Sequence, residues 1–495
     1  MTAQRPPQRA RRAIVRGLVT AALVATAATA GMSLGSPDGR VVEAAVGATL
    51  GAGGEYHRLE PVRIFDSRNP ALDVAPLGPK PTGPQDATNT VFDIPVVGRG
   101  GLPQFVDQGD GSDANVLAVA VNVTVIDPSG LGYLRAFGAG TPEGNTSLVN
   151  FSEGQIVPNS AVLRPGANGE LSIRVVTPGD PGTVDVAVDL FGWFSSSQWD
   201  ERGARLEPIE PGRVFDSREA RFGPAPVGPA GTVRVPIRGA RSYDLGRELV
   251  PNDSAVVGAL VNITGINTGT GAAPTYLAAL PTPPATGATP TTSNVNLIPG
   301  QVRANLSIVP LGADGAIHLY NRAGSTDVAL DIVGYLVEGA EVSSARGRVV
   351  PLVSPFRAFD TREAEFQAQP LSPARAEDWS FEAFVNDVRI GSEPVGPQLG
   401  LLGNLTATDL ERQYSWAPAA SFLTAYPSAT STAVPEVSNV NIFEGQTVPN
   451  LALLRYGANT DDDRCQGAHC VRFYNRAGYL DYLLDVSAVI LADAN

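Results

Sequence analysis

One set of four signatures occurs three times along this chain, in the same order and at intervals of about 145 residues. The first signature is an aromatic-Asp-Ser/Thr-Arg string and the second is an apolar run that contains an asparagine. The third is a segment with a Gly-Gln pair, and the fourth is a closing run that begins with aspartate. The signatures begin at Phe65, Val116, Ser147 and Asp185 in copy one, at Phe215, Val256, Ser293 and Asp327 in copy two, and at Phe359, Leu399, Ser438 and Asp481 in copy three. The chain is therefore a triplication of one unit.

Each copy has the length of a domain, which is too long for a solenoid or propeller repeat. The 53 glycines and 41 prolines of the chain divide the copies into short runs of alternating apolar residues, which is typical of strands. The sequence therefore predicts an all-β protein of three tandem β-sandwich or jelly-roll-like domains. We expect Asn168-Gly169 and Asp314-Gly315 to form hairpin turns. The expected limits are residues 56–197, 203–339 and 346–495.

The segments between the copies are short, running from Phe194 to Arg205 and from Leu336 to Arg348. Such linkers are expected to hold neighbouring units against each other. Two arrangements remain open at this point. One is an internal pseudo-trimer, and the other is a bent row.

The first 30 residues differ in composition from the rest of the chain. They are rich in arginine, lack acidic residues and end in a short apolar run that closes with Ala28-Thr29-Ala30. This pattern predicts a signal peptide over residues 1–30, followed by a linker over 31–55, and hence a secreted or envelope-associated protein with no membrane span after cleavage. Removing the five arginines of this leader leaves 31 basic residues against 50 acidic ones, a net charge of −19. Nucleic acid and anionic lipid are therefore poor candidate partners.

Cys465 and Cys470 are the chain's two cysteines. A zinc site needs four ligands, and His469 between the cysteines does not complete such a set. In an oxidising compartment these two cysteines are expected to form a disulfide that closes a small loop. The sequence predicts no metal ion and no cofactor.

The signatures together are similar to a known type of repeat. The combination of Asp-Ser-Arg at 66–68, Asn-Val-Thr at 122–124, the Gly-Gln segment ending in Val-Pro-Asn at 157–159 and the closing run at 185–194 resembles a tandem β-rich module of secreted actinobacterial surface proteins. That module is also found appended to exported hydrolases. The resemblance implies an extracellular accessory module without catalytic residues of its own. Copy three departs from the pattern, because Ser487-Ala488-Val489 stands where the module has a Val-Gly-Tyr run.

The asparagine of the second signature lies within a strand that is apolar on one face. Val121 and Val123 share that face, whereas Asn122 lies opposite, among small residues. A strand of this kind is expected to be covered on both sides, so the asparagine must find hydrogen-bond partners. We interpret the three equivalent residues as buried hydrogen-bonding struts, with ligand contact as the alternative. They are Asn122, Asn262 and Asn404.

The closing run carries two aspartates four residues apart, which raises the possibility of glycoside hydrolysis. Four strand residues span about 13 Å. The two glycosidase geometries require about 5–5.5 Å or 6.5–9.5 Å between the carboxylates. The pairs are therefore interpreted as structural, with Asp189, Asp331 and Asp485 as their second members.

The first signature supplies an aspartate suited to a local turn and an arginine suited to a bidentate ion pair. We expect the first and last strands of each copy to be neighbours. We further expect the arginine after the Ser or Thr to engage an aspartate of the closing strand. The residues concerned are Asp66 and Arg68, Asp216 and Arg218, and Asp360 and Arg362.

The third signature is the best candidate for recognition, because amide side chains on a turn suit the hydroxyl groups of sugars and equally suit a tie between loops. The candidate ligand-binding residues are Gln155 and Asn159, Gln301 and Asn305, and Gln446 and Asn450.

Catalytic signatures are missing from the sequence, since the three histidines do not recur between copies and no Gly-x-Ser-x-Gly elbow is present. The sequence favours a secreted, non-enzymatic cell-surface protein that binds multivalently, through its three copies, to glycan, cell envelope or a surface protein, or that serves in adhesion. A purely structural surface-layer or matrix protein is the alternative, and an extracellular hydrolase is a more distant one.

Overall fold

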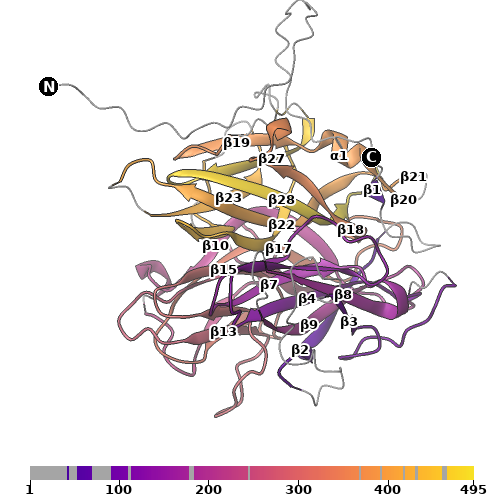
Figure 1. Ribbon diagram of the computed structural model, residues 1–495. Coiled ribbons are helices and arrows are strands. Elements are labelled where there is room, and N and C mark those ends of the chain that lie inside the picture. The colour runs from indigo at the N-terminus through magenta and orange to yellow at the C-terminus, as the bar shows by residue number, and fades with distance from the viewer. Residues whose placement is uncertain are drawn as a thin grey trace, which may run out of the picture. The chain divides into compact units, whose positions relative to one another are not determined.

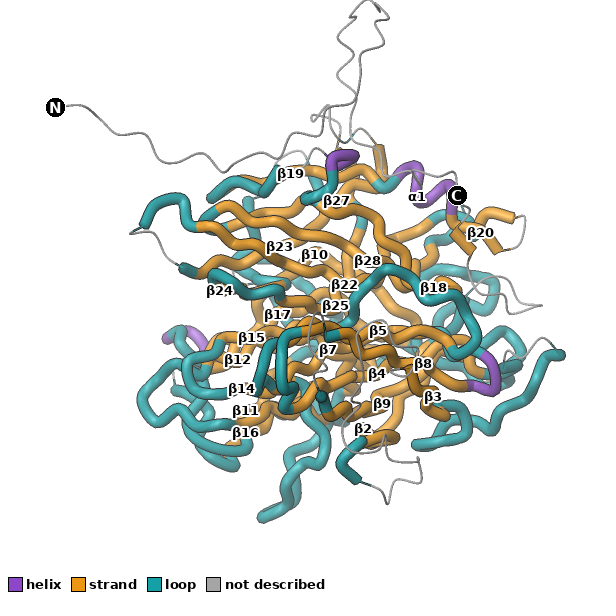
Figure 2. The backbone as a smooth tube through the Cα atoms, in the orientation of Figure 1, coloured by secondary structure: helices purple, strands orange, loops and turns teal. Residues whose placement is uncertain are grey.

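The computed structural model describes residues 42–43, 53–69, 91–109, 113–177, 183–223, 225–242, 246–366, 369–390, 393–415, 419–429, 433–459, 465 and 467–494. Strands dominate these residues (Figure 2), so the all-β prediction is confirmed. The described residues contain one α-helix, α1 (Glu382–Asp387), and three short 3-10 turns, Ala167–Gly169, Ala220–Phe222 and Ala364–Phe366. The expected signal peptide, and most of the expected linker that follows it, lie outside the described residues.

The strands of copy one form two four-stranded antiparallel sheets, in the orders β2-β9-β4-β7 and β3-β8-β5-β6. The first and last strands, β2 and β9, are therefore neighbours, as predicted. The strands are β2 (Tyr56–Asp66), β3 (Val91–Pro95), β4 (Val116–Ile126), β5 (Gly132–Gly138), β6 (Val149–Phe151), β7 (Ile156–Leu163), β8 (Glu170–Val176) and β9 (Asp185–Ser195).

Copy two repeats this topology with the orders β10-β17-β12-β15 and β11-β16-β13-β14. Its strands are β10 (Arg205–Asp216), β11 (Gly231–Pro236), β12 (Val256–Ile266), β13 (Thr275–Leu280), β14 (Val295–Leu297), β15 (Val302–Pro310), β16 (Ala316–Asn321) and β17 (Asp327–Val337). The equivalence of the two copies in sequence therefore extends to the pairing of every sheet strand.

Copy three has the same two orders, β18-β28-β22-β25 and β19-β27-β23-β24, with β26 added beside β27. Its strands are β18 (Val349–Asp360), β19 (Arg375–Ser380), β22 (Gln398–Glu411), β23 (Ala420–Pro427), β24 (Val440–Phe443), β25 (Val448–Arg455), β26 (Gly457–Asn459), β27 (Gly467–Asn475) and β28 (Tyr479–Leu491). A small sheet joins β20 (Val388–Ile390) to β21 (Glu393–Pro394) and to β1 (Val42–Glu43).

Each copy has an apolar core that draws on both of its sheets. In β4, Val119, Val121 and Val123 belong to the core of copy one. The opposite face of the same strand, with Ala118 and Ala120, belongs to a different apolar cluster. The prediction that this strand is covered on both sides is therefore confirmed, and all eleven of its residues are buried.

The second cluster is shared by the three copies. It includes Val162 of copy one, Leu260 and Leu306 of copy two, and Leu402 and Leu453 of copy three. These residues come from the sheets that contain the first and last strands of each copy. One sheet of each copy therefore packs against the equivalent sheets of the other two.

The prediction of three tandem domains requires a correction, because residues 31–495 form one compact unit. Within this unit the six main sheets lie in a ring, in the manner of a six-bladed β-propeller. The three copies appear as purple, magenta and orange-to-yellow groups of strands (Figure 1). The connectivity differs from that of propeller blades, which are built from consecutive strands. Here consecutive strands often belong to different sheets of a copy, such as β2 and β3 or β4 and β5.

The predicted Asn-Gly and Asp-Gly hairpins are wrong for the same reason. Asn168 and Gly169 adopt left-handed backbone angles, with φ of 57° and 69°. The flanking strands β7 and β8 lie in different sheets, however, as do β15 and β16 beside Asp314-Gly315. These turns therefore connect two sheets and do not close a hairpin. The residue types Asn-Gly and Asp-Gly indicate a tight turn, but they do not determine which strand each flanking strand pairs with.

The first linker between copies contacts Glu55, which is 7% exposed. Its carboxylate accepts hydrogen bonds from Arg202 Nε at 2.9 Å, from the Gly203 backbone at 2.8 Å and from Arg205 Nε at 2.8 Å. Burial raises the pKa of Glu55, but the hydrogen bonds from Arg202, Gly203 and Arg205 outweigh it and hold the pKa below its ordinary value. The start of copy one is thus tied to the first linker.

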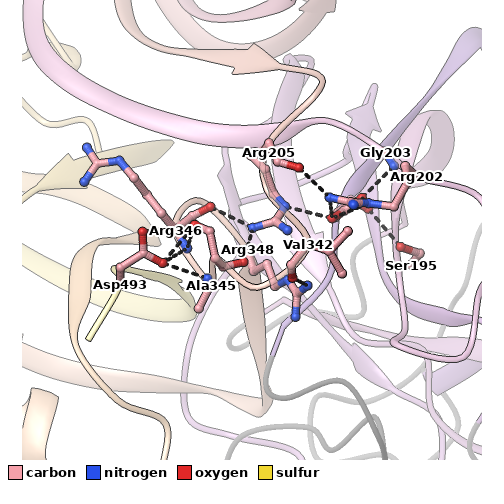
Figure 3. Close-up of polar contacts among 12 residues, drawn as sticks. Ser195, Arg202, Gly203, Arg205, Val342, Ala345, Arg346, Arg348 and Asp493 are labelled. Atoms are coloured by element: carbon pink, nitrogen blue, oxygen red, sulfur yellow. Dashed lines mark hydrogen bonds and ion pairs between the residues drawn. The ribbon is translucent and has the colours of Figure 1, made fainter. Parts of the chain in front are cut away.

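The second linker joins the same cluster (Figure 3). The Arg205 guanidinium donates to the carbonyl oxygens of Ser344 and Arg346, both at 2.9 Å. Asp493, near the end of the chain, accepts hydrogen bonds from the Ala345 backbone at 2.8 Å and from Ser344 Oγ. Both linkers and the end of copy three are therefore fastened together, as short linkers between packed units require.

The predicted disulfide between Cys465 and Cys470 is present, with 6.0 Å between the two Cα atoms. His469, between the two cysteines, has its Nδ1 2.8 Å from Glu382 Oε2 at the start of α1. The disulfide links Cys470 of β27 to Cys465, two residues before that strand begins, and belongs to copy three alone.

Replacing both cysteines by serine is expected to lower the free energy of unfolding by no more than about 2 kcal/mol, because the bond closes a very short loop. Thermal unfolding with hydrogen exchange tests this. Exchange should accelerate in β26 and β27 and stay unchanged in copies one and two. A loss of protection in all three copies would contradict a purely local role.

Among the described residues, no helix has the length and apolar character needed to cross a membrane.

Candidate functional site

The aromatic-Asp-Ser/Thr-Arg string contributes to a buried ion pair in each copy, but through a different arginine from the one predicted. In copy two, Arg213 Nε and its terminal nitrogen donate to the two carboxylate oxygens of Asp331 at 2.7 and 3.1 Å. The equivalent pairs are Arg63 with Asp189 and Arg357 with Asp485. The arginine that engages the closing strand is therefore the one that precedes the aromatic residue.

The arginines that were predicted for this role pair within their own turn. Arg218 donates to both oxygens of Asp216, and its backbone N–H donates to Asp216 Oδ1 at 3.0 Å. Arg68 and Arg362 make the same contacts with Asp66 and Asp360. The expected turn at the aspartate is present, whereas the expected contact of these arginines with the closing strand is wrong.

Strand register explains the difference. Arg213 and Asp331 are directly opposite each other on the antiparallel strands β10 and β17, so their side chains emerge on the same face. Arg218 follows the last residue of β10, Asp216, and lies beyond the ladder. An arginine in the turn therefore has no residue directly opposite it on the closing strand.

The two carboxylates beside Arg213 have opposite pKa shifts. Burial raises the pKa of Asp331 above its ordinary value, and the nearby Arg213 opposes that shift. Burial also raises the pKa of Asp216, but the hydrogen bonds from Arg218 outweigh it and the pKa is lowered. The carboxylates serve an internal ion-pair network in which Arg213 contacts both.

The first aspartate of each closing strand is also engaged. Asp185 Oδ1 accepts from Ser67 Oγ at 2.9 Å, and the Ser67 hydroxyl oxygen in turn accepts from the Val186 backbone. Asp327 with Ser217 and Asp481 with Thr361 repeat the contact. Both carboxylates of the pair therefore hold the first strand against the last.

The strand asparagines lie between neighbouring copies. Asn122 is buried, and its Nδ2 donates to the Ser293 carbonyl oxygen of copy two at 2.9 Å. Asn404 donates to the Ser147 carbonyl oxygen of copy one at 2.6 Å. Asn262 makes the corresponding contact with Ser438 of copy three. Each strut therefore joins its copy to the third signature of another.

Three of the candidate ligand-binding residues complete these ties and require a correction. Asn159, Asn305 and Asn450 are at most 1% exposed, so they cannot reach a ligand. Asn305 Nδ2 donates to Asn122 Oδ1 of copy one at 3.0 Å, Asn450 to Asn262 of copy two at 2.8 Å, and Asn159 to Asn404 of copy three at 2.8 Å. The contacts run cyclically through the three copies.

The three glutamines of the third signature are partly exposed and form one local contact each. The Oε1 atoms of Gln155, Gln301 and Gln446 accept hydrogen bonds from the backbone N–H three residues earlier, at 3.1, 3.0 and 3.1 Å. Their amide nitrogens have no hydrogen bond to the described residues. The glutamines therefore both shape their loops and retain a donor.

Two of these glutamines line the same cavity, which has a volume of about 240 Å³. Gln155 comes from copy one and Gln446 from copy three, and Gln301 is not part of the lining. The other lining residues are Leu131, Gly132, Tyr133, Asn150, Phe151 and Ser152 of copy one, Arg303 of copy two, and Gly445, Thr447 and Val448 of copy three. The cavity thus takes residues from all three copies.

Arg303 is the residue of this site that the sequence analysis missed. It is 9% exposed, and burial lowers its pKa to about 10. The equivalent residues of copies one and three are Val157 and Val448, which belong to apolar cores. A comparison of the three Gly-Gln segments position by position would have revealed this departure.

Among the described residues, no group of three or more His, Cys, Asp or Glu side chains is placed to hold a metal ion. The run Asp461-Asp462-Asp463, whose three acids suggest weak calcium binding but are more typical of a solvated turn, lies outside the described residues.

No protein-family model matches the chain, and no curated protein matches its sequence. Among solved structures, the N-terminal CBM22-1-CBM22-2 tandem domain of Paenibacillus barcinonensis Xyn10C matches with a TM-score of 0.15 and 10% sequence identity. The match covers 59% of this chain and 100% of that chain. A TM-score of this size carries no argument about the fold or function of the present chain.

Proposed function

We propose that this chain is a secreted, non-enzymatic protein that binds glycan at the cavity between the Gly-Gln loops. In this proposal each copy is a jelly-roll-like β-sandwich unit, and the three units form an internal pseudo-trimer. The strand orders and the cyclic asparagine contacts support the arrangement.

The observation that carries the proposal is the convergence of Gln155 and Gln446 on one cavity. Their amide nitrogens, together with the neighbouring Ser152 and Thr447, provide donors and acceptors suited to sugar hydroxyls. The volume of about 240 Å³ lies below the range of about 300–1,000 Å³ that is usual for small-molecule sites. One sugar residue of a longer polymer fits such a space, and the rest of the polymer would lie outside.

The structure alters the multivalent binding that the sequence suggested. The three Gly-Gln loops do not line three separate copies of this cavity, since loops one and three contribute to a single one. The proposed site is therefore a composite that requires the three copies to be packed together.

A panel of neutral and acidic polysaccharides tests the proposal. We expect saturable retention of the purified protein on at least one of them. Gln155→Ala and Gln446→Ala should each weaken it by about tenfold, the effect of losing one hydrogen bond to the ligand. Gln301→Ala is the matched control, because it removes the same loop contact but no lining residue of the cavity. Equal losses in all three variants would assign the glutamines to loop structure alone.

A structural surface-layer or matrix role is the second candidate. It is favoured by the observation that the repeated aspartates, arginines and asparagines are engaged in internal contacts. A folded protein that is retained on no polysaccharide would support this role over glycan binding.

A further inference from the structure

Arg303 combines features that are unfavourable in a purely structural residue. Across the described residues, its guanidinium has no hydrogen bond and no ion pair, although the side chain is 9% exposed. Burying a cation without a partner destabilises a fold, because the charge loses its hydration. Copies one and three avoid this problem with Val157 and Val448, so the shared architecture does not require an arginine here.

The surroundings of Arg303 favour a negatively charged ligand. The lining of the cavity contains the amides of Gln155, Gln446 and Asn150 but no carboxylate. Glu153 and Glu444 are adjacent to the Gly-Gln pairs, yet neither lines the cavity, and Glu444 is paired with Arg412 at 2.7 Å. The guanidinium therefore has unused donors in a space with further donors beside it.

We propose that the cavity binds the oxyanion of an acidic glycan, a carboxylate or a sulfate ester, with Arg303 as its charged anchor. The inference rests on the proposed glycan-binding function and adds the class of ligand. An oxyanion would accept hydrogen bonds from the Arg303 guanidinium, while the amides of Gln155 and Gln446 would reach hydroxyls of the same sugar residue.

The charge of the whole protein makes this inference easy to test. With the arginine-rich leader removed, acidic residues exceed basic ones and the net charge is −19. A protein of this charge repels polyanions in general, so non-specific ionic attraction does not explain retention on an acidic polymer. Any such retention must come from a local site.

The experiment measures binding to three probes, namely polygalacturonate, dextran sulfate and uncharged dextran. We expect the protein to bind one of the two polyanions and not dextran, and the polymer that binds identifies carboxylate or sulfate as the group recognised. Arg303→Val should weaken that binding tenfold or more, because a charge-assisted hydrogen bond is lost. Arg234→Val is the control, since it removes the same charge from the outer strand β11.

Thermal unfolding provides the second readout. Since valine occupies the equivalent position in copies one and three, Arg303→Val should fold, with a melting temperature at or above that of the parent protein. A lowered melting temperature with unchanged binding would make Arg303 structural and overturn the inference, as would parent protein that binds neither polyanion. If dextran binds as tightly as the polyanions and Gln446→Ala abolishes that binding, the cavity is a glycan site that does not recognise an oxyanion.

Discussion

Arg213→Ala is expected to lower the free energy of unfolding by about 3–5 kcal/mol, because it leaves the buried Asp331 without its charged partner. Asp331 is 1% exposed, and the Arg213 side chain is 12% exposed. The remaining contact to the Asp331 carboxylate, from the Ser438 backbone at 3.2 Å, does not neutralise its charge. Urea or thermal unfolding of the purified variant measures the loss.

Arg218→Ala is the matched control, because it removes the same residue type five positions later. Its side chain is 48% exposed, and its partner Asp216 keeps the contact with Arg213. The expected loss is about 1–2 kcal/mol, smaller than for Arg213→Ala, because Arg218 is half exposed and the buried Asp216 keeps a charged partner. Arg213→Lys should fall between the two, because lysine keeps the charge but not the two-pronged geometry. An Arg218→Ala loss that equals or exceeds that of Arg213→Ala would contradict the assignment.

The loss in Arg213→Ala should also depend on pH. Burial raises the pKa of Asp331, and Arg213 opposes that shift, so removing the arginine raises the pKa further. A carboxyl group whose pKa is higher in the folded state favours folding when it is protonated and opposes folding as pH rises through that pKa. The variant should therefore lose stability relative to the parent protein as pH rises above the ordinary range of a carboxyl group, by up to about 1.4 kcal/mol per pH unit. A difference that does not change with pH would contradict an uncompensated carboxylate.

The strand content of the fold and its division into three equivalent copies were predictable, because strand composition and repetition determine both. Alternating apolar residues identify β4 and its equivalents, and the small residues on the other face of β4 correctly indicate that this face is covered too. The partner of each strand was not predictable, since Asn168-Gly169 specifies a tight turn and says nothing about which sheet the next strand joins. The packing of the copies into one unit depends on contacts between distant residues, which local patterns do not encode.

At the candidate site, residue type indicated that the repeated polar side chains would form ion pairs and hydrogen bonds. Strand register decided which residues pair with each other. Asp189 was expected to pair with an arginine of the first strand region, and Arg63 takes that position because it lies directly opposite. Asn159 looked like a loop residue available to a ligand, although β7 in fact begins at Ile156 and carries it into the interior. Arg303 was overlooked because the signatures were defined by the residues that the three copies share, and Arg303 lies at a position where copy two differs from the others.

Asn305→Ala is expected to lower the free energy of unfolding by about 3 kcal/mol or more, because it leaves several buried groups without partners. Asn305 Nδ2 donates to Asn122 Oδ1 at 3.0 Å and to the Asn294 carbonyl oxygen at 2.6 Å. Its Oδ1 accepts from the Ser160 backbone at 3.1 Å. Two of these three contacts cross from copy two to copy one, so calorimetry should show a broader or divided transition as the copies uncouple.

Hydrogen exchange at the Ser160 amide separates this effect from a general loss of stability. In Asn305→Ala that amide has lost its acceptor, so it should exchange faster than its neighbours in β7, although the substitution lies in another copy. Asn296→Ala is the control, since the Asn296 side chain accepts a hydrogen bond from Ser293 Oγ within its own copy and has no hydrogen bond to another copy among the described residues. It should leave Ser160 unchanged. Because the same contacts recur through Asn450 and Asn159, replacing either should expose the amide of Leu306 or Leu451 in turn. Exchange confined to the substituted copy in all three variants would mean that the asparagines do not hold the copies together.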